Sequence, residues 1–139
     1  MKITQSDLEK WKNNSWETLR KIDSCSENLD YLQETKLRII PGNNKGMFYG
    51  WAFFQDNEIS VYESNPSKYL PKQFREIWNQ SGMDHELIGH LYGNYQYGEG
   101  LEEYAREIQI EFAKFRGKDN NLWNLSSKVL PHLFNIKKK

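Results

Sequence analysis

The sequence lacks the features that mark secreted and membrane proteins. It contains one cysteine, Cys25, so an internal disulfide is impossible and nothing in the cysteine pattern points to secretion. No apolar run approaches the roughly 18 residues that a membrane-spanning helix needs. Residues 1–14 are too polar for a signal peptide. These absences predict a cytoplasmic protein without a membrane partner.

Excess charge of one sign is also missing. Nineteen Lys and Arg residues balance nineteen Asp and Glu residues, and the only basic cluster is the Lys run at 137–139. A chain with no net charge does not attract phosphate over long distances, so we expect no nucleic-acid partner. Aromatic residues make up 14% of the chain, which favours a folded protein. A length of 139 residues predicts a single domain, 1–139, with one modest core.

The hydrophobic pattern predicts an α+β fold, in which a small three-stranded antiparallel sheet packs with about four to five helices. Ser6 and Glu9 have the spacing of a capping box at the start of the first helix. Gly82 weakens the second long helix and suggests a break at Ser81-Gly82. Asp56-Asn57 suits a two-residue hairpin turn. The predicted helices cover 6–22, 71–93, 101–116 and 121–130, and the predicted strands cover 37–40, 47–55 and 58–64.

The most informative stretch is DHELIGHLYG, residues 84–93. Two histidines flank Glu86, as in the helix-borne His-Glu-x-x-His motif that binds zinc and uses its glutamate as a general base. Here, however, His85 and His90 are five residues apart instead of four. On a regular α-helix they would point about 140° apart and could not bind one ion. A π-type turn would realign them, and Gly89 is the residue best able to absorb the distortion.

A tetrahedral catalytic zinc needs a third protein ligand and a water. The helix predicted at 101–116 offers two glutamates in its first turn. On a helical wheel, Glu102 lies at the edge of the buried face, near Ala105 and Gln109, whereas Glu103 lies about 160° from the centre of that face. We therefore prefer Glu102 as the ligand, with Glu103 as the alternative. The small residue Ala105 would allow a neighbouring helix to approach closely.

Three tyrosines, Tyr92, Tyr95 and Tyr97, follow the histidines closely. A phenol at this place could donate a hydrogen bond to a tetrahedral oxyanion and stabilise it. Tyrosines in such positions more often pack as half-buried loop residues. The three residues are thus candidate oxyanion stabilisers, weighed against a packing role.

The HELIGH segment is similar to the His-Glu-x-x-Gly-His motif of the dipeptidyl peptidase III family, which has the same one-residue expansion. The segment EEYARE at 102–107 resembles that family's Glu-Glu-Cys-Arg-Ala-Glu motif. Aligned without gaps, the resemblance implies that Glu103 is the zinc ligand and Glu107 its hydrogen-bond partner. Aligned on the small residue Ala105, it implies Glu102. The resemblance covers about residues 85–107, and the overall plan looks like a minimal gluzincin, or zincin-like, domain.

Together these patterns predict a zinc metallopeptidase, a hydrolase with one Zn²⁺ held by His85, His90 and Glu102 or Glu103. Its substrate would be a peptide or protein, and Glu86 would activate the metal-bound water. A strand from the region 47–63 would bind the substrate backbone. The alternative is a non-catalytic zinc-binding domain that acts as a protein-interaction module.

Overall fold

The computed structural model describes residues 2–22, 30–43, 50–53, 55–94 and 102–116. These residues form an α+β structure with a small three-stranded sheet, as the pattern predicts, and the element order is helix, strands, helices. The helices are α1 (Gln5–Ile22), α2 (Asp30–Gln33), the 3-10 helix η1 (Pro66–Tyr69), α3 (Lys72–Met83), the π-helix η2 (Asp84–Tyr92) and α5 (Glu102–Arg116). The strands are β1 (Lys36–Asn43), β2 (Gly50–Phe53) and β3 (Glu58–Ser64). The predicted helix 121–130 lies outside the described residues.

The sheet is mixed, so the prediction of an antiparallel sheet is wrong. Its strand order is β1-β3-β2, with β3 antiparallel to β2 but parallel to β1. The central strand is the most deeply buried one, since Ile59, Ser60 and Val61 are all buried. β1 therefore pairs with the apolar β3 and not with the strand that follows it in sequence. This pairing places β1 and β2 on opposite edges of the described sheet.

Pro41-Gly42 does not end β1, which continues to Asn43. The register shifts between Ile40 and Asn43, and Gly42 adopts a positive φ of 108° within that irregularity. A proline is tolerated there because β1 is an edge strand of the described sheet, where a missing N–H need not remove a ladder hydrogen bond.

The turn between β2 and β3 is longer than predicted. β2 ends at Phe53, which pairs with Glu58, so residues 54–57 connect the strands instead of two residues alone. Asn57 has the positive φ expected of a turn asparagine, 47°. Its side chain donates a hydrogen bond to the Tyr31 carbonyl at 2.8 Å and accepts one from Thr35 at 2.8 Å. The turn is thus tied to the segment that joins α2 to β1.

The first helix begins at Gln5, and its capping box is not the predicted Ser6–Glu9 pair. The Asp7 N–H donates to Thr4 Oγ1 at 3.1 Å, and the Thr4 N–H donates to Asp7 Oδ2 at 2.9 Å. Reciprocal bonds of this kind satisfy two free donors at the helix start. The motif is present but lies two residues earlier.

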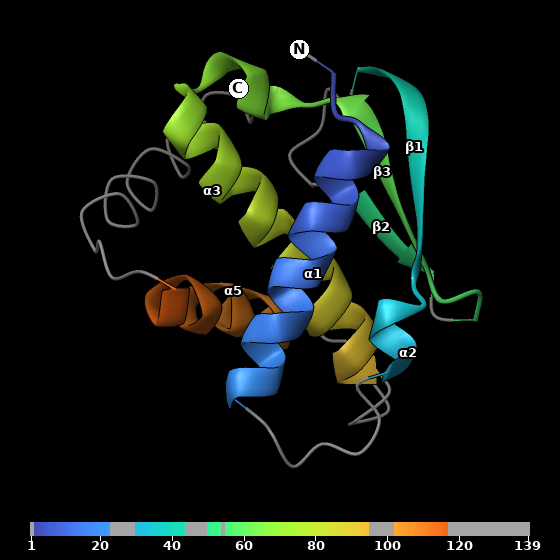
Figure 1. Cartoon of the computed structure of the whole chain (residues 1–139), viewed down its shortest axis with the longest axis vertical. Helices are drawn as coiled ribbons and strands as arrows, with labels where there is room; N and C mark the ends of the chain where they lie inside the picture. Colours follow the sequence, from blue (N-terminus) through green and yellow to red (C-terminus); the bar gives the residue numbers. More distant parts are fainter. Residues whose placement is uncertain (1, 23–29, 44–49, 54, 95–101, 117–139) are drawn as a thin grey trace.

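The elements form layers. α1 and the long helix made by α3 and η2 cover one face of the sheet, and α5 crosses them on the side away from the sheet (Figure 1). The core fills the space between the sheet and these helices. It contains Leu8, Trp11, Leu19, Leu32, Ile59, Val61, Met83, Leu87, Ile88, Leu91, Tyr92 and Phe112. Among the described helices, none has both the length and the apolarity required to cross a bilayer.

Candidate metal centre

The histidine motif lies on a π-helix. η2 continues α3 without interruption, because Met83 and Asp84, the residues at the junction, both have right-handed helical φ and ψ. At the other end of η2, Gly93 is also right-handed helical. The predicted break at Ser81-Gly82 is therefore wrong, and the predicted π-type distortion is confirmed. It extends over nine residues, Asp84–Tyr92, and not only over the single turn between the histidines.

The π-helical winding brings the two imidazoles together. The Nε2 atoms of His85 and His90 lie 3.1 Å apart, and the ring centroids lie 4.8 Å apart. Both side chains are mostly buried, with 16% of each exposed. Two ring nitrogens therefore point at the same place near the protein surface.

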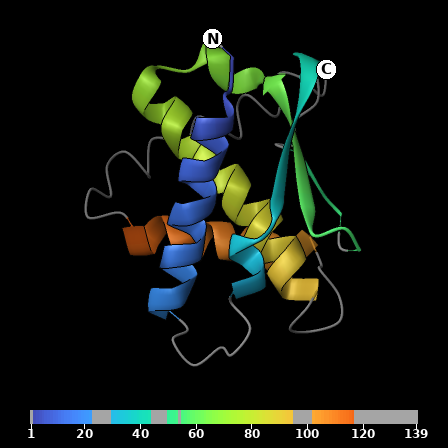
Figure 2. The same cartoon turned by 45° about the vertical axis from the view of Figure 1, so that its right-hand side comes forward.

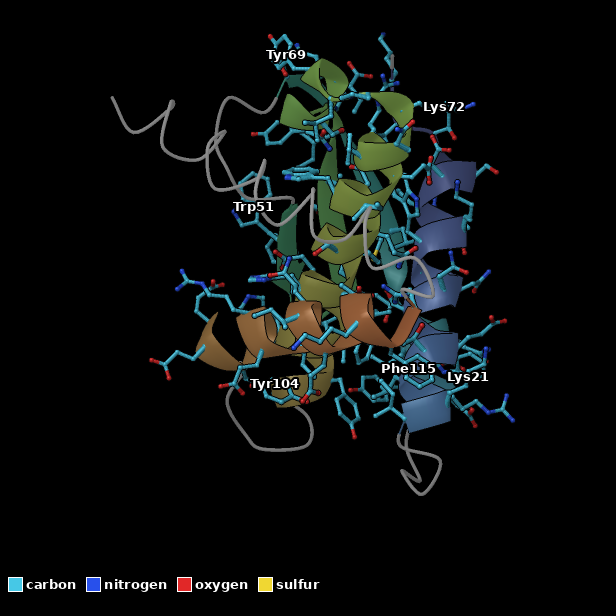
Figure 3. The ribbon with its side chains drawn as sticks, turned by 90° about the vertical axis from the view of Figure 1, so that its left-hand side faces the viewer. Lys21, Trp51, Tyr69, Lys72, Tyr104 and Phe115 are labelled. Atoms are coloured by element: carbon cyan, nitrogen blue, oxygen red, sulfur yellow. The ribbon has the colours of Figure 1, made fainter. Side chains whose placement is uncertain are left out.

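Helix α5 brings a carboxylate to this place. Glu102 is the first residue of α5, and its Oε1 atom lies 2.9 Å from Nε2 of His85 and 2.9 Å from Nε2 of His90. Figure 2 shows α5 crossing the ribbon of the π-helix, and Figure 3 looks onto α5 with the π-helix and then the sheet behind it. The preferred ligand Glu102 thus joins the histidines, whereas Glu103, which is exposed as well, is not part of the group.

The approach of α5 depends on two small residues. A Cβ atom built on Gly89 would lie 2.4 Å from Cβ and 2.5 Å from Cα of Ala105, far inside van der Waals contact. The sequence suggested that Gly89 eases the backbone distortion, but its φ is not positive. Gly89 lets the backbone of α5 pass close to the π-helix. The sequence predicts such a close approach from the small size of Ala105.

The group His85, His90 and Glu102 could hold a metal ion. Its donor atoms form a triangle with edges of 2.9, 2.9 and 3.1 Å. A tetrahedral ion with bonds of about 2.0–2.1 Å separates its donors by about 3.3 Å, so small outward movements would suffice. Partial burial acts to raise the pKa of Glu102, but the hydrogen bonds and charges of the histidines outweigh it, and the pKa is lowered. The carboxylate is thus in the ionised form that a metal ion requires.

Glu86 follows His85 in the sequence and is close enough to Glu102 for its pKa to respond to that charge. Only 4% of the residue is exposed. Burial, together with the nearby charge of Glu102, raises the pKa of Glu86 to about 8. At neutral pH this carboxyl is therefore mostly protonated in the metal-free protein, and a cation bound nearby would shift it toward the ionised form that a general base needs.

A further contact was not predicted from the sequence. Nδ1 of His85 lies 2.7 Å from Oε1 of Gln109, and the amide nitrogen of Gln109 donates to the carbonyl and hydroxyl oxygens of Ser81 at 3.1 and 2.9 Å. The helical wheel had already placed Gln109 on the same edge of α5 as Glu102, two turns away. This shared edge is the feature of the sequence that points to a contact between Gln109 and the histidine motif.

Two further candidates among the described residues, Glu107 and Tyr92, are not part of the group. Glu107, which the resemblance pairs with the third ligand, is exposed. Tyr92 is buried and belongs to the hydrophobic core. Tyr95 and Tyr97 lie outside the described residues, so an oxyanion role for the three tyrosines stays a prediction.

Comparisons with protein-family models, with curated proteins and with solved structures find no match for this chain.

Proposed function

We propose that this protein is a zinc-dependent peptidase with a minimal, zincin-like domain of the gluzincin type. One observation carries the proposal. A π-helix aligns His85 and His90 so that their Nε2 atoms and Oε1 of Glu102 converge within about 3 Å, with the buried Glu86 next to them. Two imidazoles, one carboxylate and an adjacent general base form the residue set of a catalytic zinc site.

The donor set favours zinc in particular. Two imidazole nitrogens and one carboxylate oxygen provide three of four tetrahedral positions and leave one open, as in catalytic but not structural zinc sites. When bound, zinc supplies a Lewis acid for the scissile carbonyl and lowers the pKa of water. Glu102 is 56% exposed on its side chain, which is consistent with access for a substrate.

Glu86 is the proposed general base. It follows His85 directly, and its carboxyl group is buried beside Glu102. In the proposed reaction Glu86 takes a proton from the attacking water and passes it to the leaving amine. A site that only binds a metal has no use for a general base at this position.

The proposed substrate position is beside β2. This strand is an edge strand of the described sheet and contacts the π-helix that carries the histidines. We propose that an extended peptide substrate pairs with this edge. The register of the bound peptide and its preferred side chains would then depend on the residues of β2.

The decisive experiment compares zinc content and peptide hydrolysis in the wild type, Glu86→Gln and Glu107→Gln. We expect one zinc ion per chain in all three proteins. Hydrolysis of a peptide library, followed by mass spectrometry, should fall by about 10²–10⁴-fold in Glu86→Gln and remain unchanged in Glu107→Gln, which alters an exposed carboxylate on α5.

Two other results have clear meanings. A wild type that binds no zinc refutes the proposal. A wild type that binds zinc but hydrolyses no peptide, with Glu86→Gln behaving in the same way, supports the alternative of a non-catalytic zinc-binding domain that acts as an interaction module.

A further inference from the structure

The side chain of Gln109 bridges α5 and the end of α3. One end of its amide contacts His85 and the other end contacts Ser81, which precedes His85 by four residues. The two ends differ in chemistry, because an amide has an oxygen that only accepts hydrogen bonds and a nitrogen that only donates them. The orientation of the amide therefore determines which ring nitrogen of His85 carries a proton.

The Ser81 backbone determines that orientation. Its carbonyl oxygen, 3.1 Å from the amide of Gln109, can only accept hydrogen bonds, so the group of Gln109 that faces it must be a donor. The Gln109 nitrogen must face Ser81, and the Gln109 oxygen must then face Nδ1 of His85 at 2.7 Å. An acceptor at this distance requires a proton on Nδ1.

A proton on Nδ1 leaves Nε2 of neutral His85 with its lone pair. That atom lies 2.9 Å from the Glu102 carboxylate and 3.1 Å from Nε2 of His90. A lone pair pointed at a carboxylate oxygen is unfavourable unless a proton or a metal cation lies between them. The bridge thus holds the ring in the tautomer and orientation that a metal ion can use.

From this geometry we propose that Gln109, anchored by Ser81, is a positioning residue that fixes His85 as a ligand through Nε2. The inference rests on the metal-binding part of the proposed function. It adds a role for a residue that neither the motif nor the resemblance contains. Hydrogen-bond partners of ligating histidines typically change metal affinity by about 10–100-fold when they are removed.

The first test measures zinc affinity by competition with a chromophoric chelator. Gln109→Met removes both hydrogen-bonding ends while keeping a similar shape, and we expect the zinc dissociation constant to rise by about 10–100-fold. Gln109→Glu keeps an acceptor for Nδ1, and we expect less than about a tenfold rise. Unchanged affinity in Gln109→Met, with a wild type that binds zinc, overturns the inference and leaves the proposed function standing.

A matched control separates positioning from general destabilisation. Asn79 is a buried side-chain amide on α3, bonded to Asn65, Ser67 and the Arg75 carbonyl and not to the histidines. We expect Asn79→Leu to lower the thermal unfolding temperature without changing zinc affinity. If it weakens zinc binding as much as Gln109→Met does, the specific role of Gln109 is refuted.

The second test needs no metal. Long-range ¹H–¹⁵N spectra of the zinc-free protein, at a pH where His85 is neutral, report which ring nitrogen is protonated. We expect the Nδ1–H form in the wild type and a mixture of tautomers in Gln109→Met. A wild type with the proton on Nε2 of His85 contradicts the inference. A wild type that binds no zinc in the first test refutes both the inference and the proposed function.

Discussion

The Nε2 atoms of His85 and His90 lie 3.1 Å apart although the residues are separated by five positions. On a regular α-helix the two rings would point about 140° apart, so the contact depends on the π-helix over Asp84–Tyr92. π-Helical segments are rare and concentrate at functional sites. Here the segment coincides with the residues that converge on Glu102, which supports a functional reason for it.

The close passage of α5 over Gly89 leads to a first prediction. Gly89→Ala should push α5 away from the π-helix, because the new Cβ would meet Cβ of Ala105 at 2.4 Å. We expect a loss of about 1–3 kcal/mol in the free energy of unfolding. Zinc affinity should also fall by at least about tenfold, since Glu102 moves with α5. Urea unfolding and chelator competition measure the two effects.

The double variant Gly89→Ala/Ala105→Gly tests the geometry more closely. It removes one of the two clashing atoms, but the Cα atom of Ala105, at 2.5 Å, remains. We expect at most a partial recovery of both quantities. Full recovery would mean that the two backbones are farther apart than the structure has them.

The third ligand gives a second prediction, with neighbouring residues as a matched pair. Glu102→Gln should remove most zinc binding, because an amide oxygen is a much weaker zinc ligand than a carboxylate. Glu103→Gln should leave zinc binding unchanged, since Glu103 is exposed and outside the group. Isothermal titration with zinc compares the two variants directly. The reverse pattern would favour the gapless alignment with the dipeptidyl peptidase III motif.

Much of the site could be predicted because its constraints are local. Among helix types, only a π-type turn brings His85 and His90, five residues apart, to the same face. The position of Glu102 on the helical wheel distinguishes it from Glu103. The bridge from Gln109 was missed because it depends on how α5 crosses α3, which local periodicity does not give. The close packing of Gly89 against Ala105 does not follow from the sequence for the same reason, since Ala105 is distant in sequence.

The fold shows the same division. Helix α1, the continuous helix made by α3 and η2, and helix α5 follow from apolar stripes at helical spacing, and each observed end lies within one residue of the predicted one. The parallel pairing of β1 with β3 did not follow, because pairing depends on which strand the helices bury most deeply. The alternation of apolar and polar residues within a strand does not indicate which other strand it pairs with or in which direction.

The raised pKa of Glu86 leads to a third prediction, for the zinc-free protein. Burial and the charge of Glu102 raise the pKa of Glu86 from 4.5 to about 8. A raised acid pKa contributes stability below pH 4.5 that is lost as the pH rises through 8. Glu86→Gln lacks this loss, so it should become more stable than the wild type at alkaline pH, by about 2–4 kcal/mol relative to pH 4.5.

Urea unfolding at several pH values between 4.5 and 9 measures the difference. Glu107→Gln, on the exposed side of α5, is the control and should show no comparable gain. Saturating zinc should reduce the advantage of Glu86→Gln, since a nearby cation stabilises the ionised carboxylate. Parallel stability curves for the wild type and Glu86→Gln would contradict the environment described for Glu86.

A fourth prediction concerns the ion pair between Asp84 and Arg116, which joins the start of the π-helix to the end of α5. The Asp84 side chain is 1% exposed, receives two hydrogen bonds from Arg116, and accepts another from Ser15 at 2.6 Å. Burial raises the pKa of Asp84, and the hydrogen bonds and charge of Arg116 oppose that rise. Arg116→Met would leave a buried carboxylate without its partner, at a cost of about 3–5 kcal/mol near neutral pH.

The size of that loss should depend on pH and on the second residue of the pair. Because the pKa of Asp84 rises further without Arg116, protonation at acidic pH removes the unpaired charge, and Arg116→Met should approach the wild type as the pH falls. The double variant Asp84→Asn/Arg116→Met should lose less stability at neutral pH than Arg116→Met alone, since no charge is left buried. Chemical unfolding of the three proteins at neutral and acidic pH measures these differences. Equal losses in the single and double variants at both pH values would mean that Arg116 contributes through its contacts with Phe112 and Thr18 rather than through Asp84.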